Sequence, residues 1–413
     1  MNEEYLDGRD LADVCGRSWV EVDLDRAADN LRWVKNQLSP GTGVCAIVKT
    51  NAYGHGAPEL AACFLEAGAE MLAVACLDEV LQLRRAGITS SILILSDGEP
   101  ERYAEGIEAD ATYSLFSLAK ARDLSERAVA LGRKVKVHVK VDTGMRRVGF
   151  SATAAETPGQ ILELAALPGL DVEGIFTHFA TADGFDQAES LEDDLVSEPG
   201  EQFLQLQFRD FVRLLDTLER EGLRFRYRHC CNSPATLRHP EMHLDLVRPG
   251  LTLYGLLPDN VGREEADNRP ILSLHSRALQ VRTIEQGQSV SYGRRFVATT
   301  DMRSATVPIG YGDGYRRSLT GKAEVLVHGR RVPVLGTICM DSLIIDVSKV
   351  GDAFFEGDRV VLWGEQGGAE ITIEEVAAWS DTINYEVPCA LSPRLPRVYL
   401  RDGKPFKVVR YLV

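Results

Sequence analysis

Short apolar runs alternate with helical segments through the first part of the sequence. The runs are four to eight residues long and span 44–49, 71–75, 91–95, 111–115, 135–141, 172–179, 227–231 and 244–247. Between most of them apolar residues recur at helical spacing, as in 59–67, 118–131, 160–166 and 203–221. Eight buried strands with interleaved helices predict an α/β fold, a (β/α)8 TIM-type barrel. An open doubly wound sheet is the alternative, but no GxGxxG motif follows the first run.

A different pattern begins at Ile271, where β-branched residues alternate with polar ones between glycine turns, as in AEVLVHGRRVPVLG. This pattern predicts a mostly-β domain, with a short helix at ITIEEVAAWS and a last strand at KPFKVVRYLV. The polar stretch PDNVGREEADNRP before it is typical of a linker. We therefore expect a leader at 1–17, a barrel at 18–257, a linker at 258–270 and a β domain at 271–413. The extended segment 18–22 is a candidate to pack on the β domain.

Composition and charge narrow the class of protein. The chain has 413 residues, of which 45% are hydrophobic and 26% charged, with a net charge of −15. Such an acidic chain would on average be repelled by nucleic acid or an anionic membrane. The acidic N-terminal residues do not form a signal peptide, and no apolar run reaches membrane-spanning length. We expect a cytoplasmic protein with neither partner.

Metal-binding and disulfide patterns are missing from the sequence. The eight cysteines form no CxxC pair. His239 and His243 have the spacing of a metal pair, but Pro240 follows the first and no HExxH glutamate is present. We expect no metal and structural roles for both histidines. The acidic segment 183–201 is interpreted as a solvated surface loop.

Polar residues gather where the predicted barrel strands end, which is where barrel enzymes place their functional groups. They are Lys49, the segment 140–149 (KVDTGMRRVG), the segment 177–183 (THFATAD), the segment 232–235 (NSPA) and the segment 248–250 (RPG). A strand-end lysine often only reaches solvent, and NSPA alone also fits a helix cap. The hydroxyl of Tyr53 and the glycines at 54 and 56, which allow close backbone approach, favour a ligand near Lys49.

The stretch VCAIVKTNAYGHG (44–56) closely resembles the cofactor-lysine motif of the alanine racemases. In that family a lysine holds pyridoxal 5′-phosphate (PLP) as a Schiff base. Further stretches resemble other motifs of the family in the same order, including THFATAD, NSPA, VRPGLTLYG, SVSYGRRF, GYGDGY, TICMD and INYEV. The resemblance extends from about Trp19 to Tyr399.

For the cofactor, the resemblance implies that Lys49 is the PLP lysine and that Arg248 donates to the pyridine nitrogen. An arginine cannot release its proton, so it would leave that nitrogen unprotonated and restrain side reactions such as transamination. Taken alone, a single arginine fits a surface salt bridge equally well. The other cofactor-binding residues implied are Tyr53, His178, Asn232, Ser233, Gly250, Leu251 and Tyr385.

Racemisation needs a base on each face of the substrate α-carbon. The resemblance implies Lys49 on one face and Tyr292 on the other, with His178 and Arg248 assisting the phenol. In the family the β domain closes over the partner subunit's barrel, so a homodimer with Tyr292 and Met340 contributed in trans is implied. Arg147, Met340 and Asp341 match substrate-binding residues, Lys140 matches a lysine that is often carbamylated and orients Arg147, and Asp183 and Tyr311 match the entrance.

The expected function is therefore PLP-dependent interconversion of L- and D-alanine, which supplies D-alanine for cell-wall synthesis. A broad-specificity or serine-type racemase is the nearest alternative; broad-specificity racemases are usually exported, and the absence of a signal-peptide pattern argues against one. Arg146 replaces a glycine that is frequent beside the carboxylate arginine, which bears on substrate preference and not on reaction type. A PLP amino-acid decarboxylase would carry an acidic residue at the pyridine nitrogen. A non-catalytic PLP-binding barrel would need no β domain.

Overall fold

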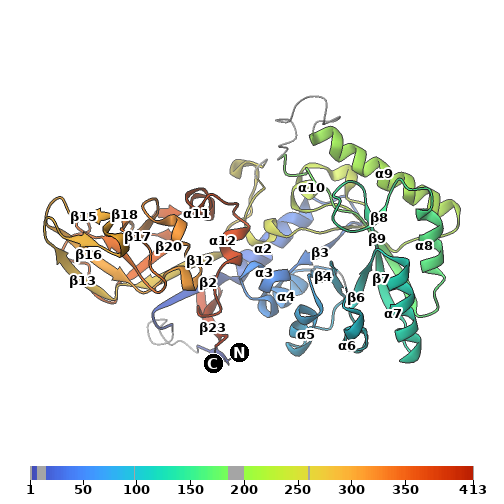
Figure 1. Ribbon diagram of the computed structural model, residues 1–413, viewed down its shortest axis with the longest axis horizontal. Coiled ribbons are helices and arrows are strands. Elements are labelled where there is room, and N and C mark those ends of the chain that lie inside the picture. Colours follow the sequence, from blue (N-terminus) through green and yellow to red (C-terminus); the bar gives the residue numbers. More distant parts are fainter. Residues whose placement is uncertain (1, 7–14, 97, 185–199, 259–260, 413) are drawn as a thin grey trace. The chain divides into compact units, whose positions relative to one another are not determined.

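The computed structural model describes residues 2–6, 15–96, 98–184, 200–258 and 261–412 (Figure 1). The chain folds into two compact units. A barrel unit comprises Ala27–Ala52 and Ala57–Arg269, and a β unit comprises Met1–Arg26, Tyr53–Gly56 and Pro270–Val413. Within the described ranges, no helix is both long enough and apolar enough to cross a membrane.

The barrel unit contains the eight parallel strands that the sequence predicts. They are β3 (Gly43–Ile47), β4 (Met71–Val74), β5 (Ile92–Ile94), β6 (Thr112–Leu115), β7 (Val135–Asp142), β9 (Leu170–Phe176), β10 (Tyr227–His229) and β11 (Leu246–Val247). They pair in the order β10-β9-β7-β6-β5-β4-β3-β11, and β8 (Phe150–Ser151) adds to β7. Backbone hydrogen bonds from Asp245 to Arg228 (3.1 Å) and from Arg248 to Cys231 (2.9 Å) join the two ends of this order. The predicted barrel fold is confirmed.

Helices surround these strands (Figure 1). They are α2 (Leu24–Asn36), α3 (Lys49–Tyr53), α4 (Ala57–Glu66), α5 (Leu77–Arg85), η1 (Pro100–Arg102), α6 (Tyr103–Glu108), α7 (Leu118–Ala130), α8 (Thr157–Ala165), α9 (Gly200–Arg220), α10 (Ser233–Arg238), η3 (Pro240–Met242), η4 (Leu251–Tyr254) and η5 (Arg263–Glu265). In α9 the side chains of Leu204, Phe211, Leu214 and Leu218 are buried at helical spacing. Burial of each such side chain contributes about 1.5–3 kcal/mol, which fixes this helix on the barrel.

The β unit is built on one large sheet with the strand order β1-β23-β22-β2-β12-β20-β17-β18-β19-β16-β13. Its strands are β1 (Asn2–Tyr5), β2 (Ser18–Asp23), β12 (Leu272–Arg277), β13 (Gln280–Ile284), β16 (Met302–Val307), β17 (Glu324–Val327), β18 (Arg330–Leu335), β19 (Leu343–Asp346), β20 (Arg359–Gln366), β21 (Ala369–Ile371), β22 (Arg397–Arg401) and β23 (Lys404–Arg410). A separate pair consists of β14 (Ser289–Val290) and β15 (Phe296–Val297). Segment 18–23 thus lies within this sheet, between β22 and β12.

Short helical elements complete the β unit: η6 (Tyr292–Arg294), η7 (Tyr311–Asp313), η8 (Arg317–Leu319), α11 (Ile373–Ser380) and α12 (Glu386–Cys389). The predicted helix near the end of the chain is α11. It begins with a capping box in which the Glu375 N–H donates to Thr372 Oγ1 (3.1 Å) and the Thr372 N–H donates to Glu375 Oε2 (3.0 Å). The predicted last strand is β23, and it pairs with β1, which the sequence pattern does not reveal.

Candidate active site

Lys49 stands directly after β3, at the start of a strained turn. Three consecutive residues beginning at Thr50 have φ of 55°, 52° and 52°, the left-handed helical region. Residues with a Cβ atom pay about 1–2 kcal/mol each for this conformation. The carboxylate of Glu79 accepts hydrogen bonds from the N–H groups of Thr50 and Ala75, and the Asn51 side chain accepts one from Ala57 (2.9 Å). These side chains hold the turn and thereby fix where Lys49 leaves the strand.

Arg248 is buried at the end of β11, with 3% of its surface exposed. Its guanidinium donates to the carbonyl oxygens of Thr177 (2.8 Å) and Cys230 (3.1 Å). It also donates to Nδ1 of His229 (2.8 Å) and Nδ1 of His178 (3.3 Å). None of these partners is a carboxylate, although an arginine keeps its positive charge even when burial lowers its pKa. The groups in direct contact with this buried charge are therefore carbonyl and imidazole dipoles.

His178 lies among the predicted site cations. Its pKa is held well below the usual range, first by burial and then by the positive charges of Arg248, Arg147, Lys140 and Lys49. The imidazole is therefore neutral at pH 7, because a second positive charge would be both desolvated and repelled. The fold thus brings five of the predicted residues from four strand ends into one electrostatic cluster.

Lys140 is also buried, with 3% of its surface exposed, and its Nζ donates to the carbonyl of Val141 (2.7 Å). Burial lowers its pKa to about 7, with smaller contributions in the same direction from Arg248 and Arg147 and an opposing one from Asp142. A substantial fraction of this amine is therefore neutral at physiological pH. The repulsion from Arg147 agrees with the expectation that the two side chains lie close together.

Ser233 and Gly250 meet at adjacent strand ends. The hydroxyl oxygen of Ser233 accepts a hydrogen bond from the Gly250 N–H (2.9 Å), which leaves the serine hydrogen for a donor contact. Asn232, not Ser233, is the cap of α10, and its side chain accepts from the Ala235 N–H (3.2 Å). Leu251 begins η4 directly after Gly250. The hydroxyl hydrogen of Ser233 is a suitable donor for a phosphate.

Tyr292, Tyr311 and Met340 lie on linked turns of the β unit, and their side chains are 72%, 42% and 52% exposed. The carbonyl of Tyr292 accepts from Thr337 Oγ1 (2.8 Å), and the Tyr311 N–H donates to the carbonyl of Cys339 (3.1 Å). The turns are hydrogen-bonded to one another while the large side chains project outward. Three predicted site residues thus share an exposed face of this unit.

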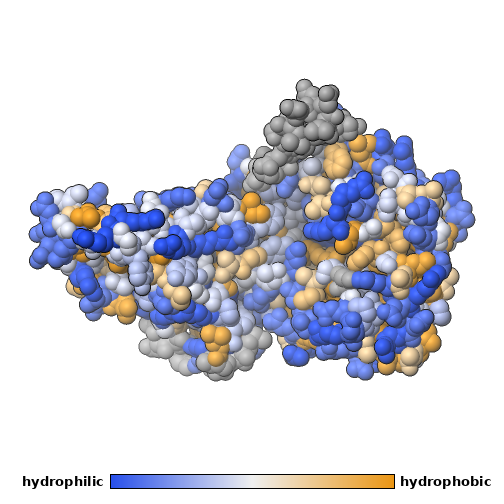
Figure 2. Space-filling view, in the orientation of Figure 1, coloured by the Kyte–Doolittle hydropathy of each residue, from blue (hydrophilic) through white to orange (hydrophobic). Residues whose placement is uncertain are grey.

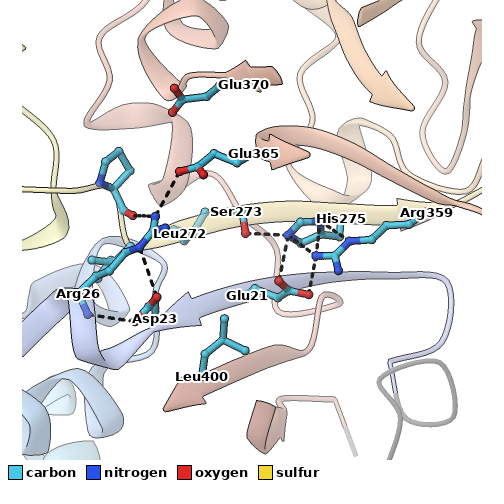
Figure 3. Close-up of a pocket in the computed structure, with 13 residues that line it drawn as sticks. Glu21, Asp23, Arg26, Leu272, Ser273, His275, Arg359, Glu365, Glu370 and Leu400 are labelled. Carbon is cyan, nitrogen blue, oxygen red and sulfur yellow. Dashed lines mark hydrogen bonds and ion pairs between the residues drawn. The ribbon is translucent and has the colours of Figure 1, made fainter. Parts of the chain in front are cut away.

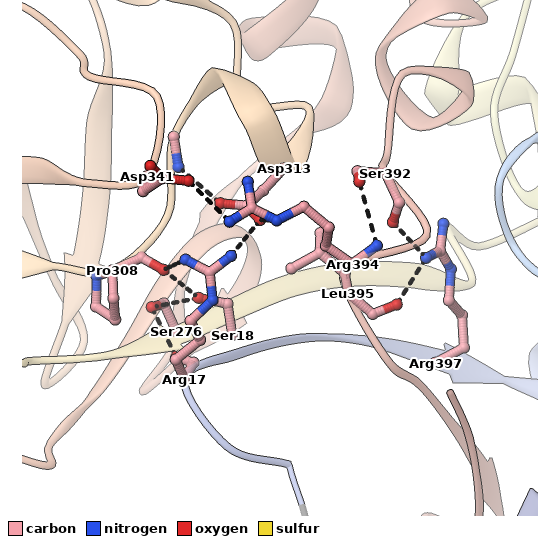
Figure 4. Close-up of polar contacts among 11 residues, drawn as sticks. Arg17, Ser18, Ser276, Pro308, Asp313, Asp341, Ser392, Arg394, Leu395 and Arg397 are labelled. Carbon is pink, nitrogen blue, oxygen red and sulfur yellow. Dashed lines mark hydrogen bonds and ion pairs between the residues drawn. The ribbon is translucent and has the colours of Figure 1, made fainter. Parts of the chain in front are cut away.

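An ion-pair chain supports the turn that carries Asp341, as Figure 4 shows. Arg394 donates to Asp341 (2.8 Å), which raises the pKa of Arg394. The fully buried Asp313 lies between Arg17 (2.6 Å) and Arg394 (3.5 Å). The arginines come from opposite ends of the chain. Sequence reasoning missed both, because no local pattern relates residues so far apart.

Tyr53 and Tyr385 lie close together in the β unit, because Tyr385 contributes, after burial, to raising the pKa of Tyr53. The expectation that the glycines after Tyr53 admit a ligand is not what the structure shows. A Cβ atom on Gly54 would lie 2.1 Å from the carbonyl oxygen of Pro388, and one on Gly56 would lie 1.8 Å from the Tyr399 hydroxyl. Both glycines make room for neighbouring protein atoms.

The remaining predicted residues are placed as follows. Asp183 is partly buried near the end of a described segment, and the acidic stretch 185–199 lies outside the described residues. His243 accepts from the Ser39 N–H (3.1 Å) and contacts the carbonyl of Thr236 (2.8 Å), which is a structural role. Over the part of the chain that the structure describes, no group of three or more His, Cys, Asp or Glu side chains could hold a metal ion.

A cavity of about 180 Å³ in the β unit contains a serine, a histidine and a glutamate but does not form a catalytic triad (Figure 3). Nε2 of His275 contacts both Ser273 Oγ (2.7 Å) and Glu21 (3.4 Å), whereas a triad needs the two partners on different ring nitrogens. Nδ1 of His275 accepts from Arg359 (3.1 Å), and burial lowers the pKa of this histidine to about 3. His275 is therefore neutral at pH 7, and the cluster has a structural role.

Two family models cover most of the chain. The model of the alanine racemase N-terminal domain matches residues 22–258, and that of the C-terminal domain matches residues 271–399. The alanine racemase of Desulfovibrio desulfuricans is 43% identical over 382 residues, 92% of this chain and 98% of that protein. The alanine racemase of Desulforamulus reducens is 40% identical over 383 residues, with the same coverage.

Solved structures agree with this relationship. The alanine racemase of Clostridium difficile superposes with a TM-score of 0.89 at 35% identity, covering 97% of this chain and all of the other. The Bacillus anthracis alanine racemase with bound L-Ala-P superposes with a TM-score of 0.84 at 36% identity, covering 96% of this chain and 98% of the other. The family models, the relatives and the solved structures together define the class as the two-domain barrel racemases. The chain belongs to the alanine racemase family.

Proposed function

We propose that this protein interconverts L-alanine and D-alanine with PLP as cofactor. The observation that carries the proposal is the buried Arg248, which is permanently charged, has no carboxylate among its hydrogen-bond partners and lies in one electrostatic cluster with His178 and Lys49. Relatives named alanine racemase, which share about 40% of their residues with this chain over nearly their full length, support it.

The residues present suit PLP. Lys49 provides an amine at a strand end, Arg248 an N–H donor for the pyridine nitrogen, and Ser233, whose oxygen accepts from the Gly250 N–H, an O–H donor for the phosphate. Tyr53, Tyr385, Asn232 and Leu251 are further contacts that the family resemblance supports. When bound, PLP supplies an electron-withdrawing ring that weakens the Cα–H bond of an amino acid attached to its aldehyde carbon. Because Arg248 cannot give up its proton, it holds the pyridine nitrogen unprotonated and limits that withdrawal.

Two groups exchange the α-proton. Lys49 Nζ removes or returns it on one face, and Tyr292 Oη does so on the other. His178, which is neutral because of its burial and its cationic neighbours, can accept a hydrogen bond from or pass a proton to the phenol. Arg147 and the Met340–Asp341 turn bind the substrate carboxylate, and Asp183 and Tyr311 line the entrance.

A homodimer completes the site. Tyr292, Tyr311 and Met340 are large side chains exposed on one hydrogen-bonded face, which is the arrangement expected of a surface that covers another protein. We assign that partner as the barrel of a second copy, so that Tyr292 and Met340 act in trans. We also propose that the enzyme acts in the cytoplasm.

Lys140 is proposed to carry a carbamate. The neutral amine attacks the carbon of CO2, the N–C bond forms, one C=O electron pair moves to oxygen, and the surplus nitrogen proton leaves to solvent. A pKa of about 7 provides the neutral amine that this reaction needs. The resulting anion attracts Arg147 where the ammonium repelled it.

The test is to incubate the PLP-loaded protein with L-alanine in D2O and to follow optical rotation and α-deuterium together. We expect loss of rotation with deuterium entering the α-position. L-serine serves as the comparison for the broad-specificity alternative and L-arginine for a decarboxylase. Release of CO2, or rotation unchanged with no exchange, would overturn the proposal. The Arg248 environment argues against decarboxylation, because that chemistry benefits from a protonated pyridine nitrogen held by an acidic side chain.

A further inference from the structure

The hydrogen bonds of Arg248 continue into a buried chain of side chains that the proposed chemistry does not use. His229, which accepts from Arg248, contacts His138 through Nε2 to Nδ1 at 2.7 Å. Nε2 of His138 lies 3.6 Å from Oε1 of Glu173. Both of these last atoms are buried without a hydrogen-bond partner among the described residues. The chain therefore runs from Arg248 through two imidazoles to a carboxylate.

The charge of Arg248 fixes the direction of every hydrogen bond in this chain. An arginine only donates, so Nδ1 of His229 must accept. A neutral His229 then carries its hydrogen on Nε2 and donates it to Nδ1 of His138. A neutral His138 in turn carries its hydrogen on Nε2, the atom that points to Glu173. The carboxylate is the group that can accept at this end, so a permanent cation and an anion terminate one polarised chain.

Burial lowers the pKa values of both histidines, so both rings are neutral at pH 7. For His138 the nearby Glu173 opposes this shift and Arg248 adds to it; the pKa of His229 is held well below the usual range by burial and then by Arg248. Aromatic stacking fixes the rings: Phe176 lies parallel to His229 at 4.9 Å between ring centroids, and Tyr227 stacks on His138 at 5.9 Å. The rings therefore cannot turn away to find other partners without losing these contacts.

The backbone is built to bring Glu173 into this position. The pairing of β7 with β9 runs Val137 to Val172 and then His138 to Gly174, so Glu173 is the extra residue of a β-bulge. A bulge re-aims a side chain that regular alternation would point elsewhere. Gly174 opposes His138 because a Cβ atom there would lie 2.5 Å from the imidazole Nδ1. An irregular strand and a glycine thus both serve the contact between Glu173 and His138.

We propose that Glu173 is a positioning residue which, through His138 and His229, holds the guanidinium of Arg248 in the orientation that donates to the pyridine nitrogen. The role rests on the proposed function, since it acts on the cofactor through Arg248. No carboxylate touches Arg248 directly, and a carboxylate in contact would compete with the pyridine nitrogen for the same N–H groups. Placing the counter-charge two imidazoles away keeps Arg248 balanced while leaving its N–H available.

The first experiment measures tautomers in the full chain, selectively labelled with 15N-histidine, with and without added PLP. We expect His138 and His229 each to show a protonated Nε2 and an unprotonated Nδ1, assigned by the signals lost in His138→Gln and His229→Gln. A protonated Nδ1 on either ring, or a doubly protonated ring, would overturn the relay. Because this measurement needs no turnover, it decides the relay even if the chain does not racemise alanine, which would instead refute the proposed function.

The second experiment compares Glu173→Ala and Glu173→Gln with Asp171→Asn, a matched change of an exposed acid two residues earlier on the same strand. We expect Glu173→Ala to lower kcat about ten- to a hundredfold, the range found when outer partners of functional groups are removed, with little change in KM. Pyridoxamine phosphate and pyruvate formed per racemisation turnover should rise, because a misplaced Arg248 no longer restrains transamination. Glu173→Gln keeps an acceptor and should restore most of kcat. Wild-type kcat and product ratio in both Glu173 variants, or equal losses in Asp171→Asn, would overturn the role.

Discussion

The barrel strand ends and the exposed face of the β unit present opposite environments for the groups they carry. At the strand ends Arg248 and Lys140 are 3% exposed, and burial with neighbouring cations lowers the pKa values of His178 and Lys140. On the β unit Tyr292 is 72% exposed on a turn fixed by backbone hydrogen bonds. One region supplies buried amine and imidazole groups whose pKa values are lowered, and the other supplies an exposed phenol. The proposed function draws on both environments, and the changes below test each of them.

The largest effect is expected from Lys49, the amine of the barrel side. In the proposed mechanism Lys49→Ala removes both the attachment point of the cofactor and one proton-transfer group, so racemisation should fall by at least about 10⁴-fold. Steady-state rates from both enantiomers measure this, with Lys134→Ala, an exposed lysine, as the matched control. A Lys49→Ala protein with activity within tenfold of wild type would remove the barrel amine from the reaction.

Tyr292→Phe tests the exposed face of the β unit. It should slow proton exchange from one enantiomer of alanine and not from the other. Removal of the hydroxyl eliminates one of two bases, so α-deuterium exchange from one enantiomer should fall about 10²–10⁴-fold while exchange from the other persists. Single-turnover exchange in D2O, started separately from L- and D-alanine, measures the asymmetry. Tyr5→Phe, another exposed tyrosine of the β unit, is the control. An equal, modest loss from both enantiomers would contradict the two-base assignment.

The burial of Lys140 at the barrel strand ends should make the free energy of unfolding depend on pH. Its pKa is 10.5 in an unfolded chain and about 7 in the fold, so between these values the unfolded chain binds a proton that the folded chain does not. The free energy of unfolding should therefore rise with pH across this window, by up to about 1.4 kcal/mol per pH unit. Below pH 7 both states are protonated and the burial penalty is fully present.

Denaturant titrations of the protein in CO2-free buffer measure this slope. Lys140→Met should abolish the Lys140 contribution and should be the more stable protein below pH 7. Addition of 13C-bicarbonate should then produce a carbamate resonance in the wild type and none in Lys140→Met. The same slope in both proteins, together with no carbamate signal, would show that the amine is neither desolvated nor modified.

The smallest effect is expected from Arg394→Ala, which releases the Asp341 turn. The exposed pair with Asp341 contributes about 0.2–1 kcal/mol, and the buried Asp313 keeps its closer partner Arg17 (2.6 Å), so stability should change little. KM for alanine should rise a few-fold because Asp341 is no longer held. Arg102→Ala removes a comparable exposed ion-pair cluster, in which Arg102 pairs with Asp78, Glu99 and Glu105, and serves as the control. If KM rises equally in both variants, the ion pairs of Arg394 do not act on substrate binding.

The sequence predicted the elements that depend on local periodicity. Eight apolar runs identified the barrel strands, and the motif around Lys49 identified the family, because both signals are contiguous in the chain. Features that depend on distant pairing were missed. The pairing of β1 with β23 and the arginines on either side of Asp313 join opposite ends of the chain. The bulge at Glu173 leaves no trace in the apolar pattern, since it changes register and not composition.

The glycines after Tyr53 show a second kind of feature that the sequence alone does not predict. Their conformational freedom was visible in the sequence, but what approaches them was not, because a glycine admits protein atoms as readily as a ligand.

The carboxylate that holds the turn after Lys49 also sets an order of events during synthesis. Glu79 lies on α5, thirty residues after Lys49, and it joins the ends of β3 and β4 by accepting from Thr50 and Ala75. On a ribosome, Lys49 leaves the exit tunnel before the side chain that aims it. A nascent chain that has exposed only the first barrel strand therefore lacks the carboxylate that holds this turn, and Lys49 acquires its direction only once the second barrel strand and its helix have folded.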